Sequence, residues 1–521
     1  MTDQRDLVMG LDLGTSALKG ALFDRDGNVH AHARGTYPLH LTQGGIAEQN
    51  PQDWWTAITA VVGTLMRETS GADRRLRGLS ISAQMCGVIP VNASGEALRP
   101  CMTWLDTRSA NTAQEMMRGW PRLSGYGLWR LLLWLKLTNG APNLAGKDAI
   151  SKFRWLEQNE PDIWSRTVKL LDVKDWLLHR FTGSFVTSED CAHLTWLMDA
   201  RAGHKRWSPT LIRLTKIDGA KLPDIVKATA MMGPIRAQTA KSLGLPDGLP
   251  VVAGAGELCA VALASGVTAL HVPHLNIGTS SWIGALSSHQ RVDIKTGVGT
   301  ICAADGENYL LIATQEAAGA SLVWAARALF PDKEDNEAIS LLAAAAEKAP
   351  VHSHSPMFFP WMFGERAPIN SDTARGSLIH LSLDTKRESL ARAIVEGIGL
   401  NTRWALEAIE KLLGPYEGTL RVTGGVAESP LLVQCLADSL GRSLEIMEHP
   451  TLAGARGAAM LAAVGAGWYE TAPQAAAAMA RPLQTITPDP QSLSLGNARF
   501  AIYKKAYGRL QPLHGMLAKL P

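Results

Sequence analysis

A short pattern occurs twice in this chain, about half its length apart. The segment LDLGTSALKGALF, which begins at Leu11, aligns without gaps with LNIGTSSWIGALS, which begins at Leu275, at an offset of 264 residues. Seven of the 13 aligned positions are identical, including Gly-Thr-Ser at the centre. Each copy predicts a strand, a tight turn and a second strand, and Asp26-Gly27 predicts a hairpin after the first copy. The repeat indicates two related domains, with chance likeness between two ordinary hairpins as the alternative.

The two Gly-Thr-Ser turns favour one kind of ligand. Glycine lets the backbone come close to an anion, and neighbouring hydroxyl groups add hydrogen-bond donors. The hydroxyl donors of the two turns are Thr15, Ser16, Thr279 and Ser280. One turn from each domain would clasp a polyphosphate from both sides.

Composition excludes several classes of protein. The 521 residues carry a net charge of only +3, which argues against a nucleic-acid partner held by its phosphates. Hydrophobic residues make up 46% and charged residues 19%, as in globular proteins, and the apolar runs are shorter than the ~20 residues of a membrane crossing. The N-terminal residues do not resemble a secretory signal, and the six cysteines form no Cys-x-x-Cys pair. We therefore expect a cytoplasmic protein that binds neither membrane nor nucleic acid.

Local signals outline the elements of the first half. Asn50 followed by Pro51 predicts a helix N-terminus, with the helix continuing to about Glu68. Residues 76–82 predict a strand, and Gln84-Met85-Cys86-Gly87 follows its C-terminal end, where open α/β sheets bind ligands. Residues 148–199 are expected to be helical.

The second half begins after a turn-rich segment, residues 244–250, which sets the expected domain boundary. The predicted domains are therefore 1–250 and 251–521. Thr385 and Glu388 have the spacing of a capping box for a long helix. Residues 419–423 predict a strand, and the Gly424-Gly425 pair and a helix beginning at Ser429 follow it. A strand, two glycines and a helix N-terminus together indicate a second place where a nucleotide can approach the backbone.

With these pieces in order, the sequence resembles the FGGY carbohydrate kinase family, xylulose kinases in particular, from about residue 7 to about residue 467. The motifs that carry the resemblance are Asp12-Leu-Gly-Thr-Ser16, Glu48-Gln49, Trp54-Trp55, Gln84-Met85-x-Gly87, Trp104-x-Asp106-x-Arg108, Gly254-x-Gly256, Gly278-Thr-Ser280, Gly364-Glu-Arg-Ala-Pro368, Glu396-Gly397 and Gly424-Gly425. The resemblance implies an α/β fold of two ribonuclease-H-like, actin-like ATPase domains that flank a central cleft. That fold agrees with the internal repeat.

The resemblance also implies a reaction, transfer of the γ-phosphoryl group of ATP to a hydroxyl of a pentulose or related polyol, with Mg²⁺. By resemblance Asp12 holds the metal through its waters, which suits a cation that prefers oxygen ligands. The residues expected around the nucleotide and its phosphates are Gly14, Thr15, Ser16, Lys19, Gly278, Thr279, Ser280, Gly319, Gly424, Gly425 and Ser429. The residues expected around the sugar are Gln84, Met85, Cys86, Trp104 and Asp106. Trp104 is equally compatible with a core position, and Arg108 is expected to pair with a nearby carboxylate.

Three positions depart from the family pattern. Glu257 stands where the family has its catalytic aspartate, and we expect it to act as the base in an active enzyme. Cys86 stands where xylulose kinases have a histidine, and because a thiol is a weak hydrogen-bonding group, the exchange puts D-xylulose itself in question. His380 replaces a glycine, and the sequence provides no functional account of it.

Two other classes of function stay open on sequence alone. The first is a kinase homologue weakened at Glu257 that acts as a sugar- and nucleotide-binding regulator. The second is an actin-like chaperone or polyphosphatase, against which the sugar-side motifs argue. A homodimer is the expected assembly if the chain is not monomeric.

Overall fold

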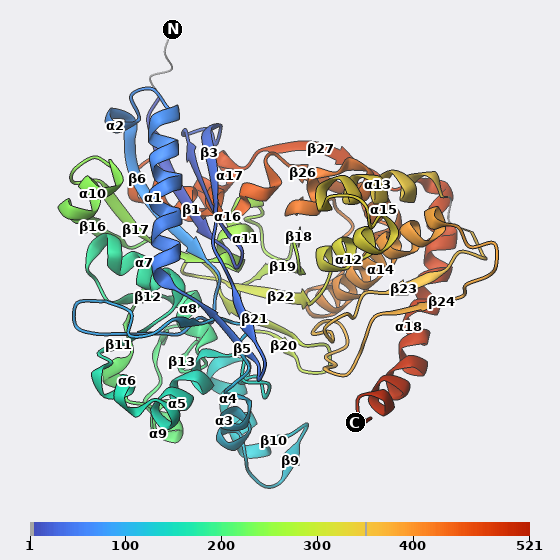
Figure 1. Ribbon diagram of the computed structural model, residues 1–521, viewed down its shortest axis with the longest axis horizontal. Coiled ribbons are helices and arrows are strands. Elements are labelled where there is room, and N and C mark those ends of the chain that lie inside the picture. Colours follow the sequence, from blue (N-terminus) through green and yellow to red (C-terminus); the bar gives the residue numbers. More distant parts are fainter. Residues whose placement is uncertain (1–4, 350–351, 521) are drawn as a thin grey trace.

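The computed structural model describes residues 5–349 and 352–520. It shows two lobes side by side, each built around one mixed sheet with helices on both faces (Figure 1). The first sheet contains, in spatial order, β16 (Met231–Pro234), β17 (Pro250–Gly256), β6 (Leu76–Ala83), β1 (Leu7–Leu13), β2 (Ala17–Phe23) and β3 (Val29–Thr36). The second contains β20 (Val292–Asp293), β21 (Val298–Cys302), β22 (Tyr309–Gln315), β19 (Ser281–Ser287), β18 (Pro273–Ile277), β25 (Leu420–Thr423), β26 (Leu444–Met447) and β27 (Pro482–Ile486).

The two sheets share one topology around the repeated pattern. β1 pairs antiparallel with β2 and parallel with β6, and β18 pairs in the same way with β19 and β25. β3 and β22 extend the hairpins, while β17 and β26 add the next parallel strand. The repeat in the sequence therefore marks the central hairpin of each of two actin-like, ribonuclease-H-like lobes, and the predicted fold is confirmed.

All of β1 is buried, and alternation along the strand decides on which face of the sheet each side chain lies. Leu7, Met9 and Leu11 pack against α1 (Pro51–Glu68) and α7 (Val173–Thr182). Val8 points to the opposite face and packs with residues of α16 (Ala453–Gly465). Because strand side chains alternate with a period of two, Asp12 lies on the α16 face, five residues from the start of the strand.

Two helices lie between the sheets and join the lobes. α11 (Glu257–Ala264) follows β17 directly, and α16 packs against it and against β1 and β6. One cluster of buried apolar side chains contains Val252 from the first sheet, Cys259 from α11, Leu461 from α16 and Trp282 from the second sheet. Figure 1 shows α16 and α17 (Ala472–Met479), which come late in the sequence, beside the strands of the first lobe. The C-terminal α18 (Pro490–Leu517) extends along the outside of the second lobe and beyond it.

Most of the predicted elements are found, with three differences. The boundary expected at residue 250 coincides with the start of β17, so the first sheet continues to Gly256. The region 148–199 contains α5 (Ala149–Asn159), α6 (Pro161–Arg166), α7 and α8 (Glu189–Leu194), but also the short strands β11 (Lys169–Leu171), β12 (Val186–Ser188) and β13 (Met198–Asp199). The capping box is wrong: α14 (Arg387–Leu413) begins after Lys386, and the Thr385 hydroxyl accepts from the Ser382 amide instead.

Candidate active site

Asp12 is the buried acid at the end of β1. It lies opposite Lys19 of β2 and beside Ser82 of β6. Burial raises the pKa of Asp12, while the charge of Lys19 and the neighbouring Ser82 hydroxyl lower it. Atom Oδ1 is buried and has no hydrogen-bond partner among the residues that the structure describes. A β-carbon on Gly454, near the start of α16, would lie 2.2 Å from the Asp12 carboxyl carbon, so only glycine leaves room for this acid.

The turn formed by Gly14, Thr15 and Ser16 follows Asp12, and neighbouring side chains donate hydrogen bonds to its oxygen atoms. The Tyr37 hydroxyl donates to the Gly14 carbonyl, and Nε2 of Gln49 donates to the Thr15 carbonyl at 2.7 Å. The indole N–H of Trp104 donates to the Thr15 hydroxyl at 3.0 Å. Within residues 5–349 and 352–520, the amides of Thr15 and Ser16 donate to no protein acceptor. The turn is therefore fixed by its carbonyls while two amides stay available to an anion.

The second turn, residues 278–280, is built in the same way. The amide of Gly319, the first residue of α12 (Gly319–Leu329), donates to the Gly278 carbonyl at 3.0 Å, and the amide of Ala320 donates to the Thr279 carbonyl at the same distance. A β-carbon on Gly319 would lie 2.2 Å from the Gly278 oxygen, which explains the glycine at this position. Thr279 is exposed, and its amide again has no acceptor in the described part of the chain.

Residues 450–454 contact Gly424, which lies beside the second turn's strand, and Asp12, which lies beside the first turn. The Gly424 amide donates to the Pro450 carbonyl at 3.0 Å. Gly424 has a φ of +91°, and a β-carbon on it would lie 2.4 Å from the Ile277 oxygen at the end of β18. Four residues after Pro450, Gly454 touches Asp12. Apart from its chain neighbours, no residue that the structure describes comes within 4 Å of the position where a side chain on Gly425 would begin. Ser429 caps α15 (Pro430–Leu440) through the Leu432 amide, as predicted.

Glu257 is the first residue of α11, directly after β17. Burial and the negative charge of Asp12 raise its pKa to about 7, and Lys19 opposes the shift. Asp12 and Glu257 therefore belong to one electrostatic site, with Lys19 as its positive charge. The same two carboxylates, together with burial, raise the pKa of Tyr37. Tyr37 has no motif around it in the sequence, which is why sequence reasoning did not include it.

The loop with Gln84, Met85 and Cys86 lies beside this pair. The Gln84 amide donates to the Leu13 carbonyl at 2.8 Å, and its side chain donates to Gln49 at 2.7 Å, which leaves its buried Oε1 without a partner in the described residues. Met85 occupies the space that a side chain on Gly256 would need. Cys86 adopts a left-handed φ of +64°, and its thiol has a raised pKa through burial and the nearby carboxylates Asp148 and Asp172. The thiol is therefore neutral.

A buried lysine ties three loops together on this side. Nζ of Lys152 donates to the carbonyls of Cys86 at 3.0 Å, Thr103 at 2.6 Å and Lys147 at 2.7 Å. All three ammonium protons are thus used, and burial lowers the pKa of Lys152. The lysine brings the Gln84–Gly87 loop, the Trp104 loop and the Asp148 loop to one point, a role that no sequence pattern indicated.

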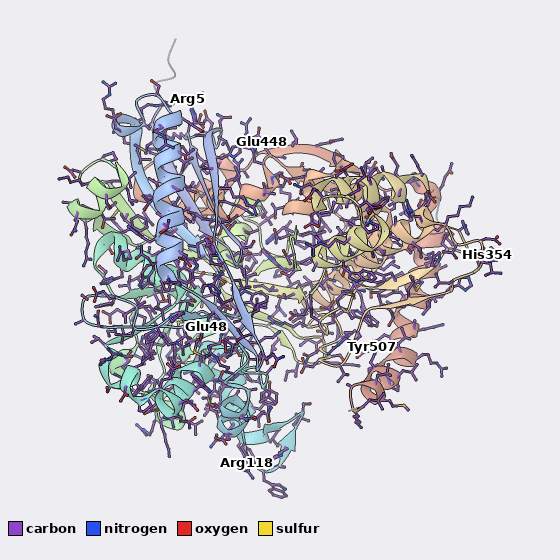
Figure 2. All side chains as sticks on the ribbon, viewed as in Figure 1. Arg5, Glu48, Arg118, His354, Glu448 and Tyr507 are labelled. Atoms are coloured by element: carbon purple, nitrogen blue, oxygen red, sulfur yellow. The ribbon has the colours of Figure 1, made fainter. Side chains whose placement is uncertain are left out.

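Asp106 is engaged by the protein itself. Oδ2 accepts from the Ala47 amide at 3.0 Å, and Arg108 binds both carboxylate oxygens. Arg108 also pairs with Glu48, labelled on the first lobe in Figure 2. This agrees with the structural role expected for Arg108. Direct contact between Asp106 and a sugar stays a prediction, and its two occupied oxygens do not favour it.

Across from these loops, the second lobe contributes Glu316 and Arg366. Arg366 pairs with Glu316 at 3.2 Å, and Lys147 of the first lobe approaches the same carboxylate at 3.8 Å. Glu365 is buried, and its carboxylate accepts from the amides of Glu316 and Arg366 and from Asn401. Glu365 and Arg366 thus shape the loop that faces the first lobe.

The donor set around Asp12 suits a magnesium ion bound mainly through water and phosphate. The described residues contain no cluster of three or more His, Cys, Asp or Glu side chains that would enclose a metal. Mg²⁺ commonly binds nucleotides through one or two carboxylates and keeps several waters. A single buried carboxylate with an oxygen free of protein donors fits that arrangement. None of the helices in the described residues is long and apolar enough to cross a bilayer.

Comparison with known proteins agrees with this geometry. The models for the N-terminal and C-terminal domains of the FGGY family of carbohydrate kinases match residues 7–264 and 274–466. A relative from Bacillus subtilis (strain 168), "Xylulose kinase", is 28% identical over 98% of both chains. The structure of ligand-bound xylulose kinase from Lactobacillus acidophilus superposes with a TM-score of 0.86 at 25% identity, covering 98% of this chain and 100% of the other. That of gluconate kinase from the same organism gives 0.85 at 25% identity, covering 98% and 99%. The chain belongs to the FGGY family of carbohydrate kinases.

Proposed function

We propose that this kinase phosphorylates a pentulose of the xylulose type or a related polyol, with Glu257 as the general base. The observation that carries the proposal is the pair of buried acids, Asp12 and Glu257, beside a turn whose amides are available to phosphate. The names of the Bacillus and Lactobacillus relatives support the substrate class. No observation favours the non-catalytic regulator.

The roles of the residues follow from their positions. Ionised Glu257 accepts the proton of the attacking hydroxyl as the new oxygen–phosphorus bond forms and the bond to the ADP oxygen breaks. The free amides of Thr15, Ser16 and Thr279 in the two turns bind the phosphates, and Lys19 balances the charge of the two acids. Asp12 would hold Mg²⁺, which neutralises phosphate charge when it is bound.

The sugar would lie against the Gln84–Cys86 loop and Trp104. The free Oε1 of Gln84 is an acceptor for a hydroxyl, whereas the neutral thiol of Cys86 is a weak partner. We therefore expect a substrate that makes one hydrogen bond fewer at this position than D-xylulose makes in its own kinases.

A substrate panel tests the proposal. The native chain is incubated with ATP, Mg²⁺ and D-xylulose, D-ribulose, L-xylulose, xylitol, erythritol, glycerol or D-gluconate, and phosphorylated product is measured by mass spectrometry. Glu257→Gln should lower kcat on the best substrate by about 10²- to 10⁴-fold, the usual contribution of a general base. Glu257→Asp tests whether the longer arm is needed. Full activity of Glu257→Gln would remove this residue from the mechanism, and sugar-dependent ATP binding without product would favour the regulator.

A further inference from the structure

One short helix, α8, contacts both the residue before the candidate base and the sheet of the other lobe. Asp190 on α8 accepts a hydrogen bond from the Gly256 amide at 2.7 Å, and Gly256 directly precedes Glu257. Asp190 is 1% exposed, so water does not compete for this bond. A charged acceptor makes a stronger hydrogen bond than a neutral one. The start of α11, and with it the backbone of Glu257, is therefore held by a carboxylate from another element.

The same helix turn binds the second lobe. His193, three residues after Asp190, accepts from the Cys302 amide of β21 through Nδ1 at 3.0 Å. Its Nε2 donates to the Thr138 carbonyl at 2.7 Å, which fixes the neutral tautomer. Burial lowers the pKa of His193 to about 4, so it stays neutral at physiological pH.

A third contact closes a triangle between α8, α11 and β21. The thiol of Cys259, two residues after Glu257, donates to the Cys302 carbonyl at 3.3 Å. Cys302 of the second lobe is thus bonded through its N–H to α8 and through its C=O to α11. All three elements are buried where they meet, since the exposed fractions of His193, Cys259 and Cys302 are at most 1%.

A second link on the outer side strengthens the connection. Nζ of Lys205 pairs with Glu189 of α8 at 2.9 Å and donates to the Gly306 carbonyl of the second lobe at 2.7 Å. Three of the six residues of α8 therefore have polar contacts that leave the helix, one toward the base and two toward the second lobe.

We propose that Asp190 is a positioning residue for Glu257, and that α8 fixes the base relative to the second lobe through His193. This inference rests on the proposed role of Glu257. It assigns no contact with substrate to Asp190: the carboxylate acts only through the Gly256 amide. A shift of about 1 Å in a catalytic group can cost about 100-fold in rate.

The test uses matched pairs of variants of the full chain. Asp190→Ala removes the acceptor, and Asp190→Asn keeps an oxygen in the same place. We expect kcat to fall about 10- to 100-fold in Asp190→Ala with little change in KM for ATP, and to recover largely in Asp190→Asn. His193→Gln keeps one donor and one acceptor, whereas His193→Leu removes both, and only the leucine variant should lower kcat.

Two further measurements separate positioning from loss of stability. Hydrogen exchange at the Gly256 amide should accelerate in Asp190→Ala. This measurement needs no ligand and does not depend on activity. Leu197→Ala, a buried substitution nearby that touches none of these bonds, should lower the melting temperature but leave kcat unchanged. Full kcat in Asp190→Ala, or an Asp190→Asn variant no better than alanine, would overturn the inference. Full activity of Glu257→Gln would instead refute the proposed base.

Discussion

Glu257 gives the site a predictable response to pH. Its pKa lies at about 7 because burial and Asp12 disfavour the ionised carboxylate. A general base works only when ionised, so protonation below this value should inactivate the enzyme. Because this pKa belongs to the free enzyme, we expect kcat/KM to fall about tenfold per pH unit on the acidic side and to level off above about pH 8.

The measurement is kcat/KM for the sugar, with ATP held well below its KM, across about pH 5.5 to 9. Because Asp12 titrates in the same pair, the midpoint belongs to the pair and not to one residue. Glu257→Gln should lose this acidic limb together with most of its activity. A native profile that is flat through pH 7 would contradict a base with the environment described here.

His380, which replaces the glycine usual in the family, is expected to lower the stability of the fold. Its φ is +65°, in the left-handed region, and its side chain is exposed after β24 (Ser377–Ile379). A side chain in this conformation costs roughly 1–2 kcal/mol, while glycine costs about 0.5–1 kcal/mol in lost chain freedom. His380→Gly should therefore raise the free energy of unfolding by up to about 1 kcal/mol, measured by thermal or urea unfolding.

The control for this substitution is His40→Gly on the exposed strand β4 (His40–Thr42), whose backbone has an ordinary extended conformation. At His40 the change to glycine relieves no strain and only increases the conformational entropy of the unfolded chain, so the free energy of unfolding should fall. If both variants were destabilised alike, strain at residue 380 would not be the reason for the family's glycine.

At the scale of elements, the N-terminus of α16 joins the acid to the nucleotide side. Gly454→Ala would place a β-carbon 2.2 Å from the Asp12 carboxyl carbon, so the carboxylate or the helix has to move. We expect kcat to fall by about 100-fold or more, because displacement by ~1 Å suffices for that loss. Gly508→Ala is the matched control: Gly508 lies in helix α18, and beyond that helix's own backbone no described residue lies within 4 Å of the added carbon. Equal activity of the two alanine variants would show that Asp12 does not need its present position.

Elements that depend on local signals were predictable, and those that depend on distant contacts were not. Asn50 and Pro51 predict the start of α1 because a cap and a fixed φ act within one turn. Thr385 and Glu388 have the right spacing, yet the Thr385 hydroxyl binds Ser382 and the helix starts later. Lys152 and Asp190 are missed because two of the three carbonyls that Lys152 binds, and the amide that Asp190 binds, lie more than 40 residues away and leave no pattern in the sequence.

At the scale of the whole molecule, the repeat correctly predicted two lobes with matching central hairpins. What the repeat does not contain is the layer between them. Residues 453–479, which follow the second sheet's β26, return to pack on the first sheet as α16 and α17. The sequences of these two helices are rich in alanine and glycine. Such a composition is typical of any buried helix and does not indicate which sheet the helix packs on. The return of this segment to the first lobe therefore appears only in the structure. It brings residues 450–454 into contact with both Gly424 and Asp12.

That shared segment leads to a test of the two turns as one binding unit. If phosphates bind between the lobes, a non-hydrolysable ATP analogue should slow amide hydrogen exchange in both turns, residues 14–16 and 278–280, at the same analogue concentration. The reason is that the free amides of both turns would donate to one ligand. Helix α10 (Ala237–Leu243) has no part in this site, and its exchange should not change. Protection of one turn alone, or of each turn at a different concentration, would mean that the turns do not grip one triphosphate, and the site would then have to be rebuilt around the protected lobe.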